Sequence, residues 1–250
     1  MKNTERFSDR VSNYVKYRPS YPAEIIQTLT EQCNLTADTV IADIGSGTGK
    51  LTELLLAQNY AIFGVEPNQA MREAAEIVFA DDGKFTSVDG QSEATGLKTN
   101  SVDLIVAAQA FHWFEPVATK TEFKRILKPG GYIALVWNQR DVESPFQLAY
   151  DQMLAQHCTE YKDVNHRNIK DSAFDAFFSP NAFDVFNFPY AQQFDKSSFL
   201  GRMYSSSYTP NPETEAAKPL HIAAEQLFDE HQHNGVIEFA YETNLYLARG

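Results

Sequence analysis

The chain has 250 residues, of which 43% are hydrophobic, enough for the buried core of one large α/β domain or of a domain with a cap. Its formal net charge of −12 argues against nucleic-acid binding, because phosphates would be repelled. With only two cysteines, no signal-peptide core and no apolar run of 18 residues, we expect a cytoplasmic protein without disulfides, metal or membrane segment.

The N-terminal segment, residues 7–21, is rich in tyrosine and arginine. It contains Tyr14, Tyr17, Arg18 and Tyr21. Such a segment can form a lid over a pocket or pack on the domain edge, and the sequence leaves both readings open. Ser20 as N-cap and Pro22 in the first turn then predict a helix that ends near Cys33.

Residues 40–52 have the pattern of a strand, a glycine-rich turn and a helix. In the turn, Asp43 is followed by glycines at alternate positions, Gly45, Gly47 and Gly49. Glycine adopts positive φ and leaves no Cβ between the main chain and a ligand. The first turn of the following helix adds unpaired N–H groups, so we expect a nucleotide-like ligand here.

The spacing of the glycines distinguishes three classes of ligand-binding turn. A P-loop requires Gly-x-x-x-x-Gly-Lys-Ser/Thr, but Leu51 follows Gly49-Lys50 and Ile44 stands at the first glycine. The dinucleotide pattern is Gly-x-Gly-x-x-Gly, whereas this turn is Asp-x-Gly-x-Gly-x-Gly. The latter resembles motif I of class I S-adenosylmethionine-dependent methyltransferases.

A second strand is predicted over residues 61–65 and ends on Glu66. A carboxylate at this place can accept hydrogen bonds from both ribose hydroxyls of a nucleoside. Pro67 then begins a helix in which Met71 should face inward, against either adenine or the core.

A third strand, residues 85–88, precedes a loop with the sequence Gly90-Gln91-Ser92-Glu93. The methyltransferases that this chain resembles carry Gly-Asp-Ala-Glu there, and the resemblance implies that Gln91 and Ser92 contact adenine. Gln91 replaces the usual acid, but its amide oxygen can still accept from the adenine amino group.

The run 102–108 predicts a fourth strand, apolar enough to be buried on both faces. Because ligands bind beyond the carboxyl ends of strands in such sheets, the residues that follow should line a substrate pocket. These residues are Gln109, Ala110, Phe111, His112, Trp113 and Phe114. Three roles stay open for His112: a catalytic base, a pocket wall, or a core histidine bonded to backbone.

Helices and strands continue to alternate up to residue 138, after which the pattern becomes less regular. A helix from Pro116 to Leu127, a turn at 128–131 and a fifth strand at 132–137 complete a pattern that predicts a parallel sheet with right-handed crossovers. Further elements are expected as helices at 144–157 and 219–231, helix signals at 161–179, and strands at 183–188 and 236–248. Residues 139–180 and 195–215 would be insertions that cap the site. His221, His231 and His233 should be solvated residues and not metal ligands.

The N-terminal Tyr/Arg segment and the run 109–114 also resemble the "type 11" group of class I methyltransferases, which includes trans-aconitate methyltransferase-like and cantharidin-resistance-like members. The resemblance implies an α/β fold, with a doubly wound, mostly parallel seven-stranded sheet and helical cap insertions. We divide the single methyltransferase domain, 1–250, into a lid and helix (1–35), a cofactor-binding core (36–138), a cap with strand six (139–215), and a final helix and strand (216–250).

The resemblance assigns S-adenosylmethionine as cofactor. The expected cofactor-binding residues are Tyr14, Arg18, Asp43, Gly45, Gly47, Gly49, Glu66, Pro67, Met71, Gln91, Ser92 and Gln109. The expected substrate residues are Tyr17, Phe111, His112 and Trp113, with His112 as the candidate catalytic residue.

The expected activity is methyl transfer to a small-molecule acceptor. Because no residue stands out as a base, a carboxylate or thiolate acceptor is favoured. Two alternatives are a non-catalytic protein that binds S-adenosyl nucleosides and a NAD-dependent oxidoreductase. The sequence gives neither the acceptor nor the oligomeric state.

Overall fold

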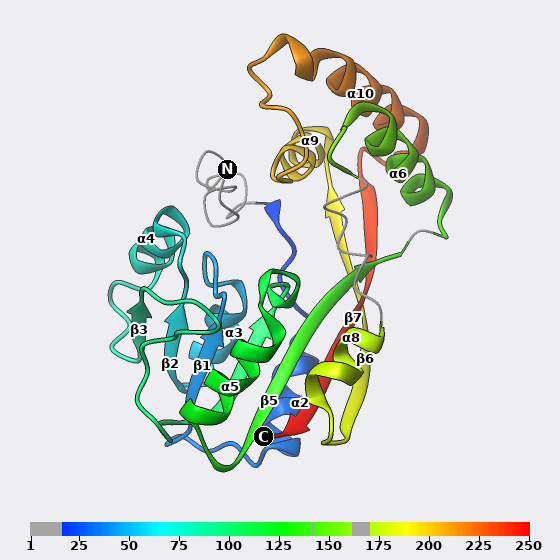
Figure 1. Cartoon of the computed structure of the whole chain (residues 1–250). Helices are drawn as coiled ribbons and strands as arrows, with labels where there is room; N and C mark the ends of the chain where they lie inside the picture. Colours follow the sequence, from blue (N-terminus) through cyan, green and yellow to red (C-terminus); the bar gives the residue numbers. More distant parts are fainter. Residues whose placement is uncertain (1–16, 142, 162–170) are drawn as a thin grey trace.

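The sheet has seven strands in the order β3-β2-β1-β4-β5-β7-β6 (Figure 1). The computed structural model of the chain describes residues 17–141, 143–161 and 171–250. The five strands from β3 to β5 are parallel, and β7 is antiparallel to both β5 and β6. This confirms the predicted fold. The strands are β1 (Val40–Ile44), β2 (Ala61–Val65), β3 (Phe85–Val88), β4 (Val102–Ala108), β5 (Leu127–Arg140), β6 (Phe183–Phe194) and β7 (Ile237–Arg249).

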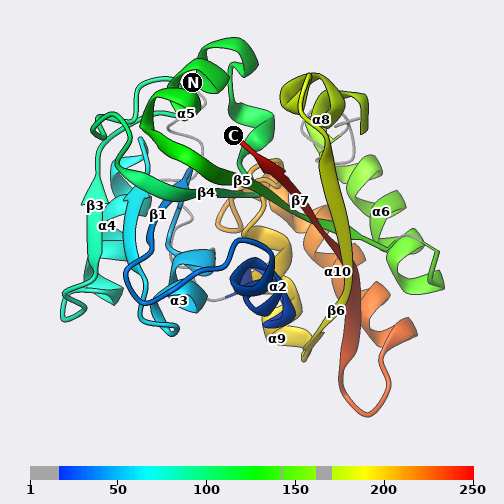
Figure 2. The ribbon, with the colours of Figure 1, turned by 90° about the horizontal axis from the view of Figure 1, so that it is seen from below.

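Helices cover both faces of the sheet (Figure 2). On one face lie α2 (Glu24–Gln32), α3 (Lys50–Leu56) and α4 (Gln69–Val78), and on the other lie α5 (Pro116–Ile126) and α8 (Asp171–Phe178). Side chains alternate along a strand, so β4 sends Leu104 and Val106 to the first face and Ile105 and Ala107 to the second. Both sets are buried, which is why this strand is apolar throughout.

A cap stands at one end of the sheet, where β5, β6 and β7 extend past the parallel strands (Figure 1). It consists of α6 (Pro145–His157), α9 (Lys196–Tyr204), the short 3₁₀ helix η4 (Glu215–Ala217) and α10 (Lys218–His231). A second 3₁₀ helix, η2 (Phe111–Trp113), follows β4 and is not part of the cap. Its core contains Tyr150 from α6, Phe199 from α9, Leu220 from α10 and Phe239 from β7. This core is separate from the two clusters that flank the sheet.

Several predicted boundaries differ from the structure. β6 runs on from Phe188 through Pro189 to Phe194, because it is an edge strand in which a residue without an N–H is tolerated. The predicted turn at 128–131 is instead an irregularity near the start of β5, where Gly130 has a φ of 81°. Ser20 does not cap α2, which begins at Glu24 after the N-cap Ala23.

The helices after β5 also pack differently from the expected insertions. α8 covers the sheet, with Phe174 and Phe177 among the side chains of β4 and β5, and so it lies outside the cap. Helix α10, predicted at 219–231 and placed outside the cap at 139–215, packs against α6 and α9 in the cap. Its apolar stripe therefore faces the cap core and not the clusters that flank the parallel strands, a difference that helical periodicity does not reveal.

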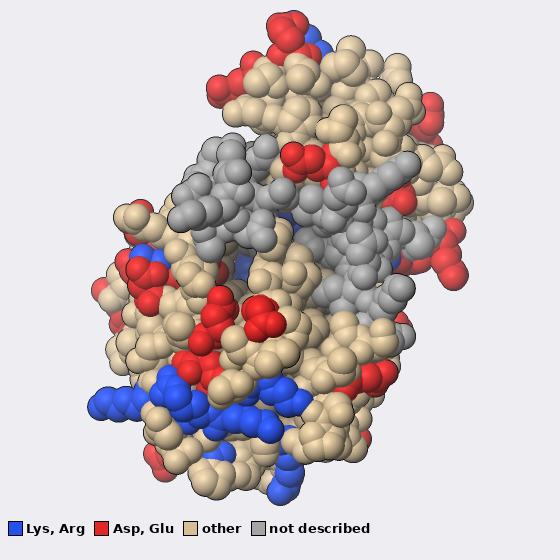
Figure 3. Space-filling model, in the orientation of Figure 1, with Lys and Arg blue, Asp and Glu red and all other residues tan. Residues whose placement is uncertain are grey.

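On the face shown in Figure 3, lysine and arginine side chains gather in one band near the lower end, while acidic side chains are spread more widely. Over the three described ranges, no helix combines the length and apolarity needed to cross a bilayer. Within the same ranges, no three His, Cys, Asp or Glu residues cluster closely enough to hold a metal ion.

Candidate active site

A cavity of about 200 Å³ lies beyond the carboxyl ends of β1, β2 and β4. Parallel strands meet at this edge, so their following turns converge on one ligand space. The cavity brings together most of the predicted site residues: Arg18, Asp43, Gly45, Gly47, Glu66, Pro67, Met71, Gln91, Ser92, Gln109, His112 and Trp113.

The three glycines after β1 serve different purposes, although all have positive φ. A Cβ on Gly45 would lie 2.6 Å from the Cβ of Ala110, and one on Gly49 would lie 2.3 Å from the ring of Phe79. A Cβ on Gly47 would meet only the sulfur of Met71, at 3.8 Å. The side chain missing from Gly47 therefore leaves space for a ligand. Gly49, expected to bind the cofactor, instead allows close packing and is the N-cap of α3.

Glu66 joins the glycine turn to the start of α4. Its Oε2 accepts the N–H of Gly47 at 2.9 Å, and its Oε1 accepts the N–H of Asn68 at 2.7 Å. The side chain is 7% exposed, and burial raises the pKa of its carboxyl group while the two N–H donors oppose that shift. Each carboxylate oxygen can accept a further hydrogen bond, so a diol could bind here without displacing either N–H.

Asp43 forms the floor of the cavity and is 1% exposed. Its Oδ2 accepts the hydroxyl of Thr52 at 2.7 Å, whereas its Oδ1 has no donor within the described ranges. Burial raises the pKa of Asp43 to about 7, an effect that Thr52 reduces and the nearby Glu66 reinforces. A buried acceptor without a donor fits a ligand that brings an ammonium or hydroxyl group, and S-adenosylmethionine carries both.

The loop after β3 is held by α5. Ser92 is buried, donates to Glu93, and accepts the hydroxyl of Thr119 at 2.9 Å. Three residues farther on, both the N–H and the hydroxyl of Thr95 donate to Glu122, at 2.9 and 2.6 Å.

Glu122 was not among the expected site residues, because in sequence it looks like an ordinary helix-surface charge. Hydrogen bonds from Arg125 are the main reason that the pKa of Glu122 falls to about 2. The ionised carboxylate therefore fixes the loop that places Gln91 and Ser92 at the cavity.

Gln109 lies at the carboxyl end of β4 with a φ of 53°, a left-handed conformation that is uncommon for a residue other than glycine. Its Nε2 donates to the carbonyl oxygen of Asn138 on β5 at 2.9 Å. Its Oε1 is buried and has no donor in the described part of the chain. This oxygen is a second acceptor available to a ligand. The left-handed backbone also fits a functional role, because strained residues cluster at functional sites.

His112 and Trp113 line the cavity on the 3₁₀ turn after β4. The imidazole packs on Trp113 and edge-on to Trp137, with ring centroids 4.4 and 5.4 Å away. Burial, and next to it the charge of Arg18, lowers the pKa of His112 to about 4. The ring is thus neutral at pH 7.

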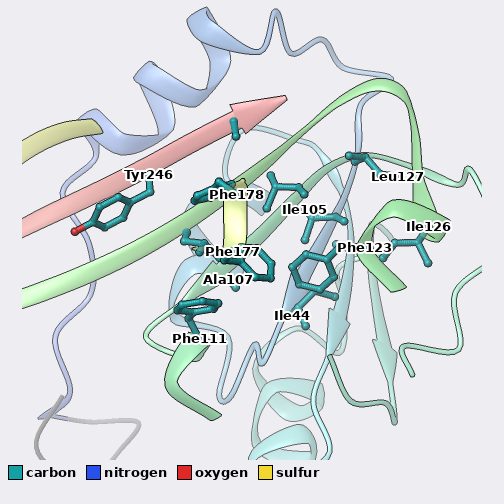
Figure 4. Packing of buried hydrophobic residues seen from close by; sticks show 14 of the residues in the cluster. Ile44, Ile105, Ala107, Phe111, Phe123, Ile126, Leu127, Phe177, Phe178 and Tyr246 are labelled. Atoms are coloured by element: carbon teal, nitrogen blue, oxygen red, sulfur yellow. The ribbon is translucent and has the colours of Figure 1, made fainter. Parts of the chain in front are cut away.

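Phe111 was expected to contact substrate, but the structure places it in the core. It is 6% exposed and packs on Phe174 and Phe177, with ring centroids 5.3 and 5.0 Å away. Figure 4 shows it among the buried side chains under the sheet. The turn at η2 points neighbouring residues in opposite directions, which a run of aromatic residues in the sequence conceals.

The N-terminal segment links the cavity to the cap. Arg18 lines the cavity and donates from Nη2 to the carbonyl oxygen of Ser205, directly after α9, at 3.1 Å. The ring of Tyr17 packs against Gly201 of α9, where a Cβ would lie 2.1 Å away, and does not line the cavity. Tyr14 lies outside the described residues.

Comparison with known proteins bears on the same region. The family model "Methyltransferase domain" matches residues 42–135, which begin in β1 and end in β5. Residues 42–135 are therefore similar to known methyltransferase domains. This confirms the resemblance to class I methyltransferases, whereas the trans-aconitate and cantharidin subgroup stays a prediction.

Two relatives and one solved structure show how far the similarity reaches. An uncharacterized methyltransferase of Mycobacterium tuberculosis is 37% identical over 54% of this chain and 53% of that protein. A "probable S-adenosylmethionine-dependent methyltransferase" of Saccharomyces cerevisiae is 28% identical over 49% of this chain and 43% of that protein. The chain thus spans about half the length of the curated relatives it matches. A putative type II methyltransferase from Anaeromyxobacter dehalogenans shares the fold, with a TM-score of 0.68, 23% identity and coverage of 94% of this chain and 97% of that one.

The first prediction concerns Gly47. Gly47→Val should abolish binding of S-adenosylhomocysteine while leaving the sheet folded, because the added methyl groups would fill the ligand space. Gly235→Val is the matched control, since Gly235 also has positive φ and open surroundings but lies in the turn before β7. Circular dichroism and isothermal titration on the same samples decide the matter. Binding retained in Gly47→Val would place the ligand elsewhere.

Proposed function

We propose that this chain transfers a methyl group from S-adenosylmethionine to a small-molecule acceptor. The observation that carries the proposal is the buried carboxylate of Glu66, bonded to the N–H of Gly47 at the one glycine whose missing side chain leaves space in the cavity. The family match over residues 42–135 supports the same activity. The two free cysteines, Cys33 and Cys158, are consistent with the further proposal of a cytoplasmic location.

The chain's own residues account for cofactor binding. Glu66 would accept the ribose hydroxyls, and the orphaned oxygen of Asp43 would accept from the amino group of the methionine moiety. Gln91 and the main chain at Ser92 would meet the adenine. The buried side chain of Met71 and the half-buried Pro67 add apolar surface to the same space.

When bound, S-adenosylmethionine supplies a methyl group that its sulfonium has already activated. The protein then has to hold the acceptor in line with that methyl group and keep water out, and positioning of this kind can contribute about 7–11 kcal/mol to lowering a barrier. His112 and Trp113, at the end of β4, form the wall against which we place the acceptor.

We propose a carboxylate or thiolate as the acceptor group, since neither needs a strong base at neutral pH. The imidazole of His112, with a pKa of about 4, is too weak a base to remove a proton from a hydroxyl or an amine. Its neutral ring can still orient an acceptor by hydrogen bonding.

The second prediction separates the proposed cofactor from the alternative, NAD. S-adenosylhomocysteine should raise the melting temperature, and at a hundred times its dissociation constant the stabilisation should reach about 2.7 kcal/mol. NAD should give no comparable shift, because the turn lacks the Gly-x-Gly-x-x-Gly spacing. Differential scanning fluorimetry with both ligands tests this. Stabilisation by NAD alone would reverse the assignment. Binding of S-adenosylhomocysteine without turnover on any small acid or thiol would favour a non-catalytic binding protein.

The third prediction is that Glu66→Gln weakens cofactor binding by about five- to thirtyfold and leaves the fold intact. The amide keeps one acceptor oxygen but loses the negative charge that strengthens hydrogen bonds from hydroxyls. Glu73→Gln is a suitable control, because Glu73 lies on the exposed side of the same helix, α4. Isothermal titration of the three proteins gives the comparison. Equal affinities would mean that Glu66 only supports the turn.

The fourth prediction concerns His112. Since the folded-state pKa of about 4 lies below the ordinary value of 6.5, the ring stays neutral from pH 5 to 9, and the pH profile of kcat should show no break near 6.5 from this residue. His112→Ala should lower kcat by tens of fold or less, as for a wall residue. Steady-state kinetics against pH provide the test. A loss of about 10²–10⁴-fold, with a break that vanishes in the variant, would identify a general base.

A further inference from the structure

The cap contains a second group of polar side chains, separate from those that line the cavity. Arg202 on α9, Tyr150 on α6 and Tyr241 on β7 are all buried, with exposed fractions of 6%, 1% and 6%. Arg202 donates from Nη2 to the hydroxyl of Tyr241 at 3.3 Å, and its guanidinium carbon lies 5.8 Å from the ring centroid of Phe239. We name Arg202, Tyr150 and Tyr241 the cap cluster.

The charge of Arg202 has no counterpart in the described ranges. A guanidinium remains protonated even when buried, and a buried cation without an anion is strongly unfavourable. No described carboxylate pairs with Arg202, and its Nε and Nη1 have no acceptor there. The hydroxyl of Tyr150 also has no hydrogen-bond partner among these residues. Three donor groups are thus buried and unused.

A second buried arginine in this region, Arg140, does have a carboxylate partner. Arg140, at the end of β5, donates to Asp151 and to the hydroxyl of Tyr161, both at 2.8 Å. Burial raises the pKa of Tyr150, whereas Arg202 and Arg140 both lower it, so both guanidinium groups act on that hydroxyl. Among the described residues, Arg140 thus has a carboxylate partner in Asp151, whereas Arg202 has none.

The cap cluster adjoins the cavity through two elements. On β5, the guanidinium carbon of Arg140 lies 4.9 Å from the ring centroid of Tyr150. Arg140 is two residues beyond Asn138, whose carbonyl oxygen accepts from Gln109 at the cavity, and two strand residues span about 7 Å. On α9, the hydroxyl of Ser205 donates to the carbonyl oxygen of Arg202 at 2.7 Å, and Ser205 in turn accepts from the cavity residue Arg18. Chain segments that hold the cap cluster thus contact residues of the cavity on two sides.

We propose that the cap cluster binds an anionic group of the methyl acceptor, a carboxylate or a phosphate, while the reacting end of the acceptor lies beside His112 and Trp113. The anion would accept from Arg202 Nε and Nη1 and from the hydroxyl of Tyr150, the three donor groups that lack partners. Surface lysines and arginines, such as those in Figure 3, are hydrated by solvent and therefore need no anionic partner. The inference rests on the proposed methyltransferase function and narrows its acceptor to an anion.

The experiment uses the full chain saturated with S-adenosylhomocysteine. Malonate and inorganic phosphate, each at about 20 mM, are compared with sodium chloride at equal ionic strength. We expect malonate or phosphate to raise the melting temperature by about 2–4 °C beyond chloride. The anion that gives the larger gain identifies the group that the cap cluster prefers.

Four variants locate the effect. Arg202→Met should remove the gain and Tyr150→Phe should at least halve it. Arg249→Met and Tyr204→Phe should keep it, because Arg249 is exposed near the C-terminal end of β7 and the hydroxyl of Tyr204 bonds to His221, away from the cap cluster. A gain that persists in Arg202→Met, or no anion-specific gain in the parent, overturns the proposal. If Arg202→Met does not fold, an undiminished gain in Tyr150→Phe overturns it equally.

Turnover gives a second readout once acceptors are screened. Small dicarboxylates and phosphorylated acids should be methylated in preference to their amides and esters, and Arg202→Met should raise KM by at least about tenfold with kcat nearly unchanged. Methylation of neutral acceptors alone overturns the inference while leaving the proposed function standing. Failure of the parent to bind S-adenosylhomocysteine would instead count against the proposed function itself.

Discussion

The carboxylate of Glu66 organises the site, because it closes the end of β2 onto the turn after β1. Its two oxygens accept the N–H groups of Gly47 and Asn68, so one buried side chain fixes both the glycine turn and the first turn of α4. These N–H groups would otherwise be orphans at the edge of a parallel sheet. The same bonds orient the carboxylate toward the cavity, so a structural requirement and a binding requirement fall on one residue.

The parallel half of the sheet could be predicted from local patterns. The strands observed at 61–65, 85–88 and 102–108 have the predicted limits, and β1 lies at the start of the predicted strand-turn-helix pattern over 40–52. β1, β2 and β4 bury side chains on both faces, so the fold sets their composition and the sequence alone reveals them, whereas β3 is an edge strand with Thr86 exposed. The site residues at the ends of these strands, Asp43 and Glu66 among them, follow from the same topology.

The orientation of Phe111, the packing of α10 and the roles of Glu122 and Arg202 depend on contacts between residues far apart in the sequence, which local patterns do not contain. Whether Phe111 faces substrate or core depends on α8, some sixty residues later, which stacks Phe174 on it. The helical period of α10 shows an apolar stripe but not that its partner is α6. Glu122 and Arg202 carry no sequence signal, since an acid on α5 and an arginine on α9 look like solvent-exposed residues until the structure shows what they meet.

Both the cavity and the cap contain buried polar groups that have no hydrogen-bond partner among the described residues. Asp43 Oδ1 and Gln109 Oε1 are acceptors in the cavity, while Arg202 and the hydroxyl of Tyr150 are donors in the cap. Each omission lowers stability, by about 1–3 kcal/mol for a neutral group and more for a charge. The acceptors in the cavity and the donors in the cap are complementary to ligands that bring hydrogen-bond donors to the cavity and an anion to the cap. An S-adenosyl donor would supply the hydrogen-bond donors that Asp43 and Gln109 lack, and an anionic acceptor would supply the hydrogen-bond acceptors that Arg202 and Tyr150 lack. The two reactants of the proposed reaction would thus complete the hydrogen bonding of the fold.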